Sequence, residues 1–318
     1  MDSLLRAKRA AARGDRVVGR TAGTWDATRR KPVAYLYVLP AMIFLVLFTY
    51  WPMLRTFELG FYRWNMIAPV MDFVGLDNYR ALVTSSDFWI AFRNTLKYMI
   101  AVLPLAVGLP LLIAVLLLNL SGRLQAAFKV MLFSPSIVSF AIGSMVWLWI
   151  LNPISGLANQ LLATVGLAGK SWLSDPDWAI WTIVLLMAWK SFGYNLVIFL
   201  AGLSAIPPEY HEAAAVDGAS AWQVFRHVTW HLLTPTTLFV LLSTLVATAQ
   251  HIFTPVQILT NGGPARSTTN LVFIIYEYGF QFFQTGLASA AAVLMFVAFL
   301  AFTWAQFRLL ERFVHYES

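Results

Sequence analysis

Six long apolar segments constrain the fold of this chain more than any other feature of its sequence. Each is close to the ~20 residues that a helix needs to cross the hydrocarbon core of a bilayer, and a helix pairs all its own backbone polar groups there. Only 12% of the residues are charged and 59% are hydrophobic, against about a quarter charged in soluble domains, so a soluble globular protein is excluded. The sequence predicts an all-α polytopic membrane protein with six transmembrane helices, at residues 33–54, 94–118, 130–150, 179–203, 232–253 and 287–309.

Several prolines lie within these predicted helices. A proline removes one backbone donor and would break a helix in water, but in lipid a neighbouring helix can satisfy the freed carbonyl groups. We therefore expect kinks, not loops, at Pro40, Pro52, Pro104, Pro110 and Pro135.

The distribution of basic residues predicts how the chain is oriented. Residues 1–31 hold nine of the 22 Lys and Arg residues and almost no large apolar residue, which predicts a basic cytoplasmic tail ahead of a transmembrane domain at 32–318. With this tail inside, 14 Lys and Arg fall on the cytoplasmic side and seven on the outer side, in agreement with the positive-inside rule. Six spans then place both termini and the segment 204–231 in the cytoplasm, and the net charge of +7 points to a membrane, not to nucleic acid.

The cytoplasmic segment 206–228 is organised like a helical hairpin. Glu209 stands where the N-terminal dipole of a first helix favours negative charge, and Gly218 is a natural stop for that helix. Ser220, with Gln223 three residues later, has the spacing of a capping box at the start of a second helix. Helix physics alone leaves two interpretations open, an ordered hairpin or an amphipathic linker on the membrane surface.

The same segment resembles the EAA loop of ABC-importer permeases. The residues that carry the resemblance are Glu212-Ala213-Ala214, Asp217-Gly218-Ala219, Phe225 and Pro235, and they precede the penultimate span as they do in that family. The six spans, the turn at 260–264 and the end at 308–316 are similar to permeases of the maltose-permease-like type, which serve sugars and glycerol phosphate. One departure is visible, because this chain has Trp230-His231 where the family often has Leu-Pro.

The resemblance implies a permease subunit of an ATP-driven importer in a bacterial cytoplasmic (inner) membrane. A second homologous permease subunit, two ATPase subunits and an external solute-binding protein would complete the assembly. ATP would be hydrolysed by the partner subunits, so no cofactor is expected on this chain. The hairpin residues expected to couple to the ATPase are Glu212, Ala213, Ala214, Asp217, Gly218 and Phe225, with Glu212 and Gly218 at the centre.

Each candidate nucleotide-binding or metal-binding motif in the sequence lacks a residue that it requires. The Gly-Lys-Ser that ends at residue 171 lacks the first glycine of a P-loop, and His227 and His231 have no third metal ligand nearby. The predicted spans contain no Asp or Glu, which argues against an intramembrane acid–base enzyme and an ion-coupled carrier. We expect neither an enzyme nor a metal site, and the alternative from another class is a self-sufficient channel or carrier.

Lys190 is the single full charge in the middle of a predicted span, and an intramembrane lysine is by default a functional residue. A purely structural interpretation, in which Lys190 pairs with a backbone carbonyl or with an acid of a partner subunit, stays equally open. With Tyr194, Asn195 and Gln250 it is predicted to line the solute cavity. Since a lysine suits an anionic headgroup, glycerol-3-phosphate or a glycerophosphodiester is the leading expectation, and a neutral di- or oligosaccharide is the alternative.

Overall fold

The fold comes from a computed structural model in which residues 32–118 and 120–313 are described. The predicted basic tail at 1–31 and residues 314–316 of the predicted family-like end lie outside these ranges. The chain divides into two units, Met1–Arg55 and Thr56–Ser318. The first unit contains helix α2 (Pro32–Leu45), the π-helical turn η2 (Val46–Tyr50) and the start of α3 (Trp51–Leu59).

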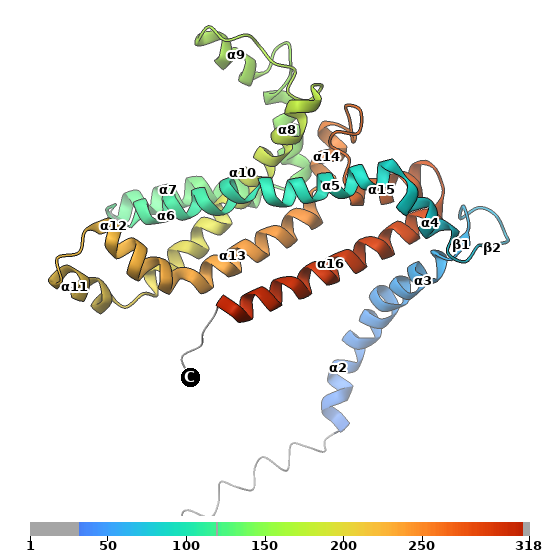
Figure 1. Ribbon diagram of the computed structural model, residues 1–318, viewed down its shortest axis with the longest axis horizontal. Helices are drawn as coiled ribbons and strands as arrows, with labels where there is room; N and C mark the ends of the chain where they lie inside the picture. The colour runs from blue at the N-terminus through green and yellow to red at the C-terminus, as the bar shows by residue number, and fades with distance from the viewer. Residues whose placement is uncertain (1–31, 119, 314–318) are drawn as a thin grey trace, which may run out of the picture. The chain divides into compact units, whose positions relative to one another are not determined.

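The second unit is built from long helices that lie lengthwise between two ends (Figure 1). A helical hairpin occupies one end, and α4 with two short antiparallel strands occupies the other, where Tyr62 pairs with Phe73. We call these the hairpin end and the strand end. The elements are β1 (Tyr62–Arg63), β2 (Asp72–Phe73), α4 (Asp77–Thr84), α5 (Ser86–Ala101), η3 (Pro104–Gly108), α6 (Leu109–Leu117), α7 (Gly122–Ile137), α8 (Phe140–Ile150), α9 (Leu157–Thr164), α10 (Pro176–Ser204), α11 (Pro208–Val216), α12 (Ala221–Val224), η4 (Phe225–Thr229), α13 (Trp230–His251), α14 (Phe253–Leu259), α15 (Leu271–Tyr276), η5 (Glu277–Gln281) and α16 (Thr285–Phe313).

The predicted all-α membrane architecture is confirmed. Within the described residues, five helices are long and apolar enough to cross a membrane, and the number is six if a strongly bent pair forms one span. The five overlap the predicted segments, and Pro40, Pro52, Pro104 and Pro110 lie inside them, with Pro104 as the first residue of the π-helical turn η3. The five helices are Tyr35–Leu59, Ser86–Leu117, Pro176–Ser204, Ala221–His251 and Thr285–Gln306.

The third predicted span needs a correction. The sequence predicted one kinked helix at 130–150, but α7 ends at Ile137 and α8 begins at Phe140, with an angle of 101° between them. Val138 and Ser139 adopt extended backbone conformations between the two helices, and the Ser139 side chain caps α8 by accepting a hydrogen bond from the Ile142 backbone N–H. The chain therefore breaks three residues after Pro135 instead of bending at it.

Helix α10 forms the centre of the second unit, because more than half of its most apolar stretch is buried. Its inner side chains join one apolar cluster with α5 and α14, and a second with α6 and α13. At Gly193 the backbone of α7 comes so close that an added Cβ would lie 2.8 Å from the carbonyl carbon of Leu132 and nearer still to its oxygen. This contact fixes α7 against α10 next to the break.

The predicted hairpin is confirmed as an ordered structure. Helix α11 ends at Val216, and Gly218, two residues later, has a φ of +72°. The Ala219 backbone N–H bonds to the Ala214 carbonyl and closes the helix. The predicted capping box between Ser220 and Gln223 opens α12. From there a single helix runs through η4 into α13, so the chain passes Trp230 without interruption.

Candidate functional site

Most of the predicted coupling residues are exposed on the surface of the hairpin. Glu212, Ala213, Asp217 and Gly218 are exposed, and Ala214 and Phe225 are partly buried. Two large apolar side chains accompany them, Val216 with 88% and Trp222 with 66% of its surface exposed. Trp222 stacks on Phe225 with ring centroids 5.8 Å apart, which stiffens the second helix. The hairpin end therefore offers a rigid surface that combines a carboxylate with uncovered apolar groups.

A cavity of about 510 Å³ lies where the α7–α8 break meets α10 and α13. It contains three of the four predicted cavity residues, Lys190, Tyr194 and Asn195, whereas the exposed Gln250 does not line it. The next residue, His251, takes part instead and stacks on Phe140 at 5.0 Å. The full lining is Phe133, Ser136, Val138, Ser139, Phe140, Met187, Lys190, Ser191, Tyr194, Asn195, Ser243, Thr244, Ala247 and His251.

The three buried polar residues of this cavity, Lys190, Asn195 and Thr244, are bonded to the protein itself. The Lys190 Nζ donates hydrogen bonds to backbone carbonyls on both sides of Ile137, which is the structural alternative that the sequence left open. The Asn195 Nδ2 donates to the Ala106 carbonyl and, at 2.9 Å, to the Thr244 Oγ1. The hydroxyl groups of Tyr194 and Ser191 have no hydrogen-bond partner within the described chain, and Tyr194 is half exposed.

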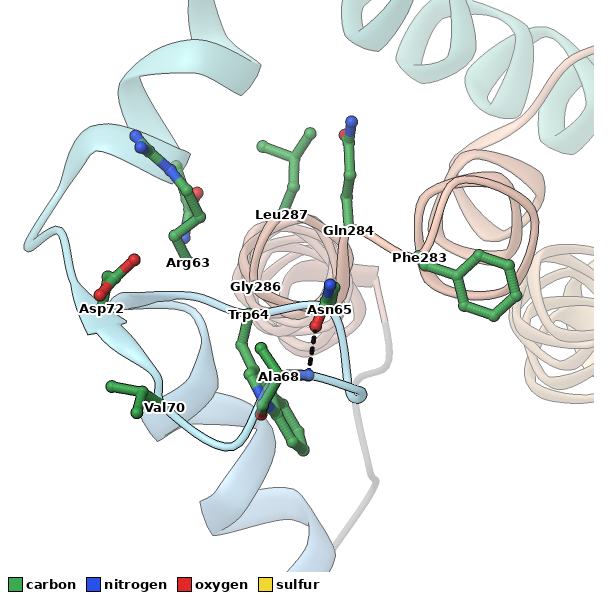
Figure 2. Close-up of a pocket in the computed structure, with 11 residues that line it drawn as sticks. Arg63, Trp64, Asn65, Ala68, Val70, Asp72, Phe283, Gln284, Gly286 and Leu287 are labelled. Carbon is green, nitrogen blue, oxygen red and sulfur yellow. Dashed lines mark hydrogen bonds between the residues drawn. The ribbon is translucent and has the colours of Figure 1, made fainter.

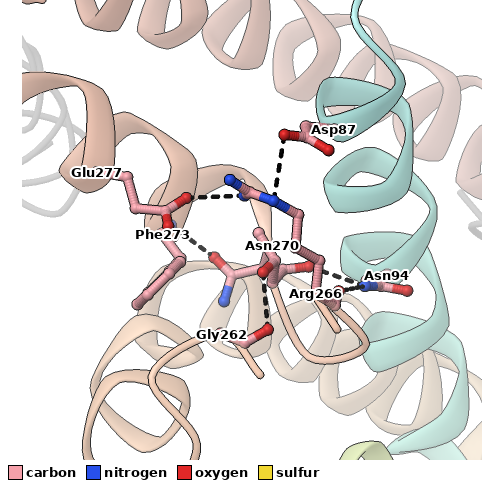
Figure 3. Close-up of polar contacts among 8 residues, drawn as sticks. Asp87, Asn94, Gly262, Arg266, Asn270, Phe273 and Glu277 are labelled. Atoms are coloured by element: carbon pink, nitrogen blue, oxygen red, sulfur yellow. Dashed lines mark hydrogen bonds and ion pairs between the residues drawn. The ribbon is translucent and has the colours of Figure 1, made fainter. Parts of the chain in front are cut away.

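A partly buried polar network organises the strand end (Figure 3). The guanidinium group of Arg266 lies between Asp87 of α5 at 3.1 Å and Glu277 of η5 at 3.0 Å. The Asn94 Nδ2 donates to the backbone carbonyls of Arg266, Ser267 and Thr269 at 3.0–3.2 Å. These contacts hold the turn that follows α14 against α5.

The same network shifts a nearby tyrosine. Burial raises the pKa of the Tyr278 hydroxyl, and the negative charge of Asp87 raises this pKa further. Sequence reasoning missed the cluster because Asp87 and Asn94 of α5 lie more than 170 positions before Arg266 in the chain.

A second cavity, of about 430 Å³, opens at the strand end beside the start of α16 (Figure 2). Arg63, Trp64 and Asp72 come from the strands and their turn, and Gln284 and Leu287 come from the other side. The Asn65 side chain accepts a hydrogen bond from the Ala68 backbone N–H at 2.8 Å, which orders the turn. This cavity is separate from the one at the α7–α8 break, and no motif in the sequence marked it.

Metal-binding side chains do not converge in the described part of the chain, since no group of three His, Asp or Glu residues is close enough to hold an ion. His227, one of the two histidines weighed as metal ligands, lies 3.1 Å from the Gln223 backbone carbonyl.

An apolar helical unit with a doubly capped hairpin before its penultimate long helix is the arrangement expected of an ABC-importer permease subunit. The chain belongs to the family of binding-protein-dependent transport system inner membrane components, whose model matches residues 111–316. The resemblance seen in the sequence is thereby confirmed, and the protein is a permease of the carbohydrate ABC importer type. Its relatives are transport permeases, not enzymes.

Relatives and a solved structure support this membership. The sn-glycerol-3-phosphate transport system permease UgpA of Agrobacterium fabrum is 32% identical over 286 residues, covering 90% of this chain and 97% of that protein. The arabinooligosaccharides transport system permease AraP of Bacillus subtilis is 29% identical over 272 residues, covering 85% and 86%. A bacterial ABC transporter involved in the import of the acidic polysaccharide alginate superimposes with a TM-score of 0.80 at 25% identity, over 92% of this chain and 99% of that one.

Proposed function

We propose that this chain pairs with a second, homologous permease subunit, binds two ATPase subunits, and receives solute from an external binding protein. In a bacterial cytoplasmic membrane, the hairpin and both termini would face the cytoplasm. The observation that carries the proposal is the hairpin itself, an ordered and capped helix pair whose central residues are exposed.

The chemistry of the hairpin surface suits a protein groove. Uncovered apolar side chains such as Val216 and Trp222 gain free energy when a partner removes them from water. The exposed Glu212 carboxylate can accept charge-assisted hydrogen bonds from a basic residue of the ATPase. Together these groups favour insertion of the hairpin into a groove that is apolar in its centre and basic at its edge.

The hairpin is connected directly to two long helices and would transmit its movement to them. Helix α10 leads into it after Ser204, and the helix that starts at Ala221 leaves it without a break up to His251. Both helices line the cavity at the α7–α8 break. A rigid-body movement of the hairpin would therefore move two walls of that cavity, which is how closure of the ATPase would reach the solute.

We assign Lys190, Tyr194 and Asn195 to the solute path, together with Phe140 and His251, which were not among the four predicted cavity residues. Gln250 is left out of this assignment because it does not line the cavity. Two solute classes fit the names of the relatives, glycerol-3-phosphate on the one hand and neutral oligosaccharides on the other.

The proposal is tested by reconstituting the chain with its permease, ATPase and binding-protein partners in proteoliposomes and measuring ATP-driven uptake. Glu212→Ala should reduce uptake and ATPase association while the protein still inserts. Asp177→Ala, which removes an exposed carboxylate at the first turn of α10, is the matched control and should behave like the wild type. Equal uptake by wild type and Glu212→Ala would contradict the coupling role, and uptake by this chain alone would favour a self-sufficient carrier.

A further inference from the structure

The break between α7 and α8 leaves backbone carbonyls without helical partners. Helix α7 ends at Ile137, and the extended Val138 and Ser139 cannot supply the N–H groups that the last turn needs. An unpaired carbonyl inside a membrane protein is costly unless a protein group or cavity water replaces the missing donor. A donor from another element would therefore stabilise the break.

Lys190 of α10 provides it. Its Nζ donates to the carbonyl oxygens of Pro135 at 2.7 Å and Ser136 at 3.2 Å, and also to that of Val138. The Ser136 hydroxyl donates in return to the Lys190 backbone carbonyl at 2.9 Å. Because an ammonium group carries three hydrogens, these three carbonyls use its whole donor capacity. The side chain is also buried, with 6% of its surface exposed.

The positive charge of Lys190 is compensated where it lies. The C-terminal end of a helix carries a partial negative charge, and Nζ sits at that end of the 16-residue α7. The Phe140 ring lies 5.2 Å from Nζ, within the range of a cation–π contact. An anionic solute could bind Nζ only by drawing it away from the carbonyls and leaving them unpaired.

The groups that are free to meet a solute are neutral. The hydroxyls of Tyr194 and Ser191 have no partner in the described chain, and the Asn195 Oδ1 stays free to accept because only its Nδ2 is engaged. The stacked Phe140 and His251 rings supply an aromatic surface at the same cavity. Among the described residues that line it there is no Asp, Glu or Arg. Hydroxyls, an amide oxygen and aromatic faces are the groups that suit a sugar ring.

We infer that this cavity takes an uncharged, polyhydroxylated solute, and that Lys190 is a positioning residue that holds the α7–α8 break instead of a receptor for an anionic headgroup. The inference rests on the proposed function, since it takes the cavity to be part of the solute path. It reverses the sequence-based preference for glycerol-3-phosphate, which assumed that the lysine was available to the solute.

The test is equilibrium dialysis of radiolabelled probes against the purified importer without its binding protein. Co-purified ATPase and ATP hydrolysis are checked first, so that a failure of assembly counts against the proposed function alone. The neutral probes are arabinotriose, maltotriose and raffinose, and the anionic probes are sn-glycerol 3-phosphate and a mannuronate trisaccharide. We expect at least one neutral probe to bind about tenfold or more tightly than either anion, because an anion must break the Lys190 hydrogen bonds. Tighter binding of an anion, or no binding of any neutral probe, would overturn the inference.

Variants at Lys190 separate the two roles. As a positioning residue, Lys190→Met should lower the unfolding temperature of the importer and leave anion binding unchanged, and Lys190→Arg should recover part of the stability by restoring donors. As an anion receptor, Lys190→Met should abolish anion binding at unchanged stability. Ser191→Ala, next to it on α10, removes a hydroxyl without a partner and is the control for stability. If Lys190→Met does not assemble, the wild-type dialysis still decides the question.

Discussion

The close crossing of α7 and α10 makes Gly193→Ala a sharp test of the fold around the cavity. The new Cβ would lie 2.8 Å from the carbonyl carbon of Leu132, and closer to its oxygen and to the Cα of Phe133, whereas ordinary contacts begin near 3.4 Å. Both neighbours are backbone atoms, so no side chain can move aside, and the helices must separate by at least about 0.6 Å. Overpacking of this kind typically costs about 1–3 kcal/mol.

The expected result is a loss of thermal stability. A change of this size lowers an unfolding temperature by about 2–10 °C in a protein of a few hundred residues, which is measurable by the intrinsic fluorescence of the purified importer during heating. Gly108→Ala is the matched control, because it is also a glycine in a long apolar helix and an added Cβ there meets nothing within 4 Å. Equal stability of wild type and Gly193→Ala would refute the crossing geometry.

Three further predictions concern the two ends of the second unit. Asn94→Leu removes the amide that donates to three backbone carbonyls and should destabilise the importer by about 1–3 kcal/mol. Cleavage within residues 260–270 in limited proteolysis should increase. Unchanged cleavage would argue against a role of Asn94 in anchoring this turn. Gly218→Ala and its control Gly75→Ala each place a Cβ at positive φ with nothing within 4 Å, which costs about 1–2 kcal/mol of backbone strain. Only Gly218→Ala should weaken co-purification of the ATPase. Equal effects of the two variants would contradict the coupling role of the hairpin. The pKa of Tyr278 in the folded protein lies above the unfolded value of 10.0, so its contribution to stability is complete below pH 10 and declines as the pH rises above it. Tyr278→Phe should therefore reduce the fall in unfolding temperature at alkaline pH. An identical pH profile for wild type and variant would contradict the raised pKa of Tyr278.

The hairpin could be predicted from the sequence because its determinants are local. A glycine that ends a helix and a Ser–Gln capping box act within a few residues, and the structure contains both at Gly218 and at Ser220–Gln223. The long apolar helices were predictable for the same reason, since composition over about 20 residues decides them.

The break after Pro135 and the cavity that it shapes depend on contacts between distant segments. The hydrogen-bond partners of Lys190 lie more than 50 positions earlier in the chain. The sequence could therefore identify Lys190 as a candidate, but it could not show whether its ammonium group binds backbone carbonyls or a solute. The difference between Gln250 and His251 is one of helical phase, because adjacent residues on a helix point about 100° apart. In α13 the exposed and buried positions do not follow a clear polar pattern, and the sequence therefore pointed to Gln250, whereas His251 lines this cavity.

The most direct measurement of the central claim is the composition of the complex that this chain forms. The tagged protein is extracted from its native membrane in mild detergent, and its partners are identified and counted by native mass spectrometry. We expect one copy of this chain, one homologous permease subunit and two ATPase subunits. A folded protein that elutes alone, with no ATPase bound under any extraction condition, would contradict this expectation.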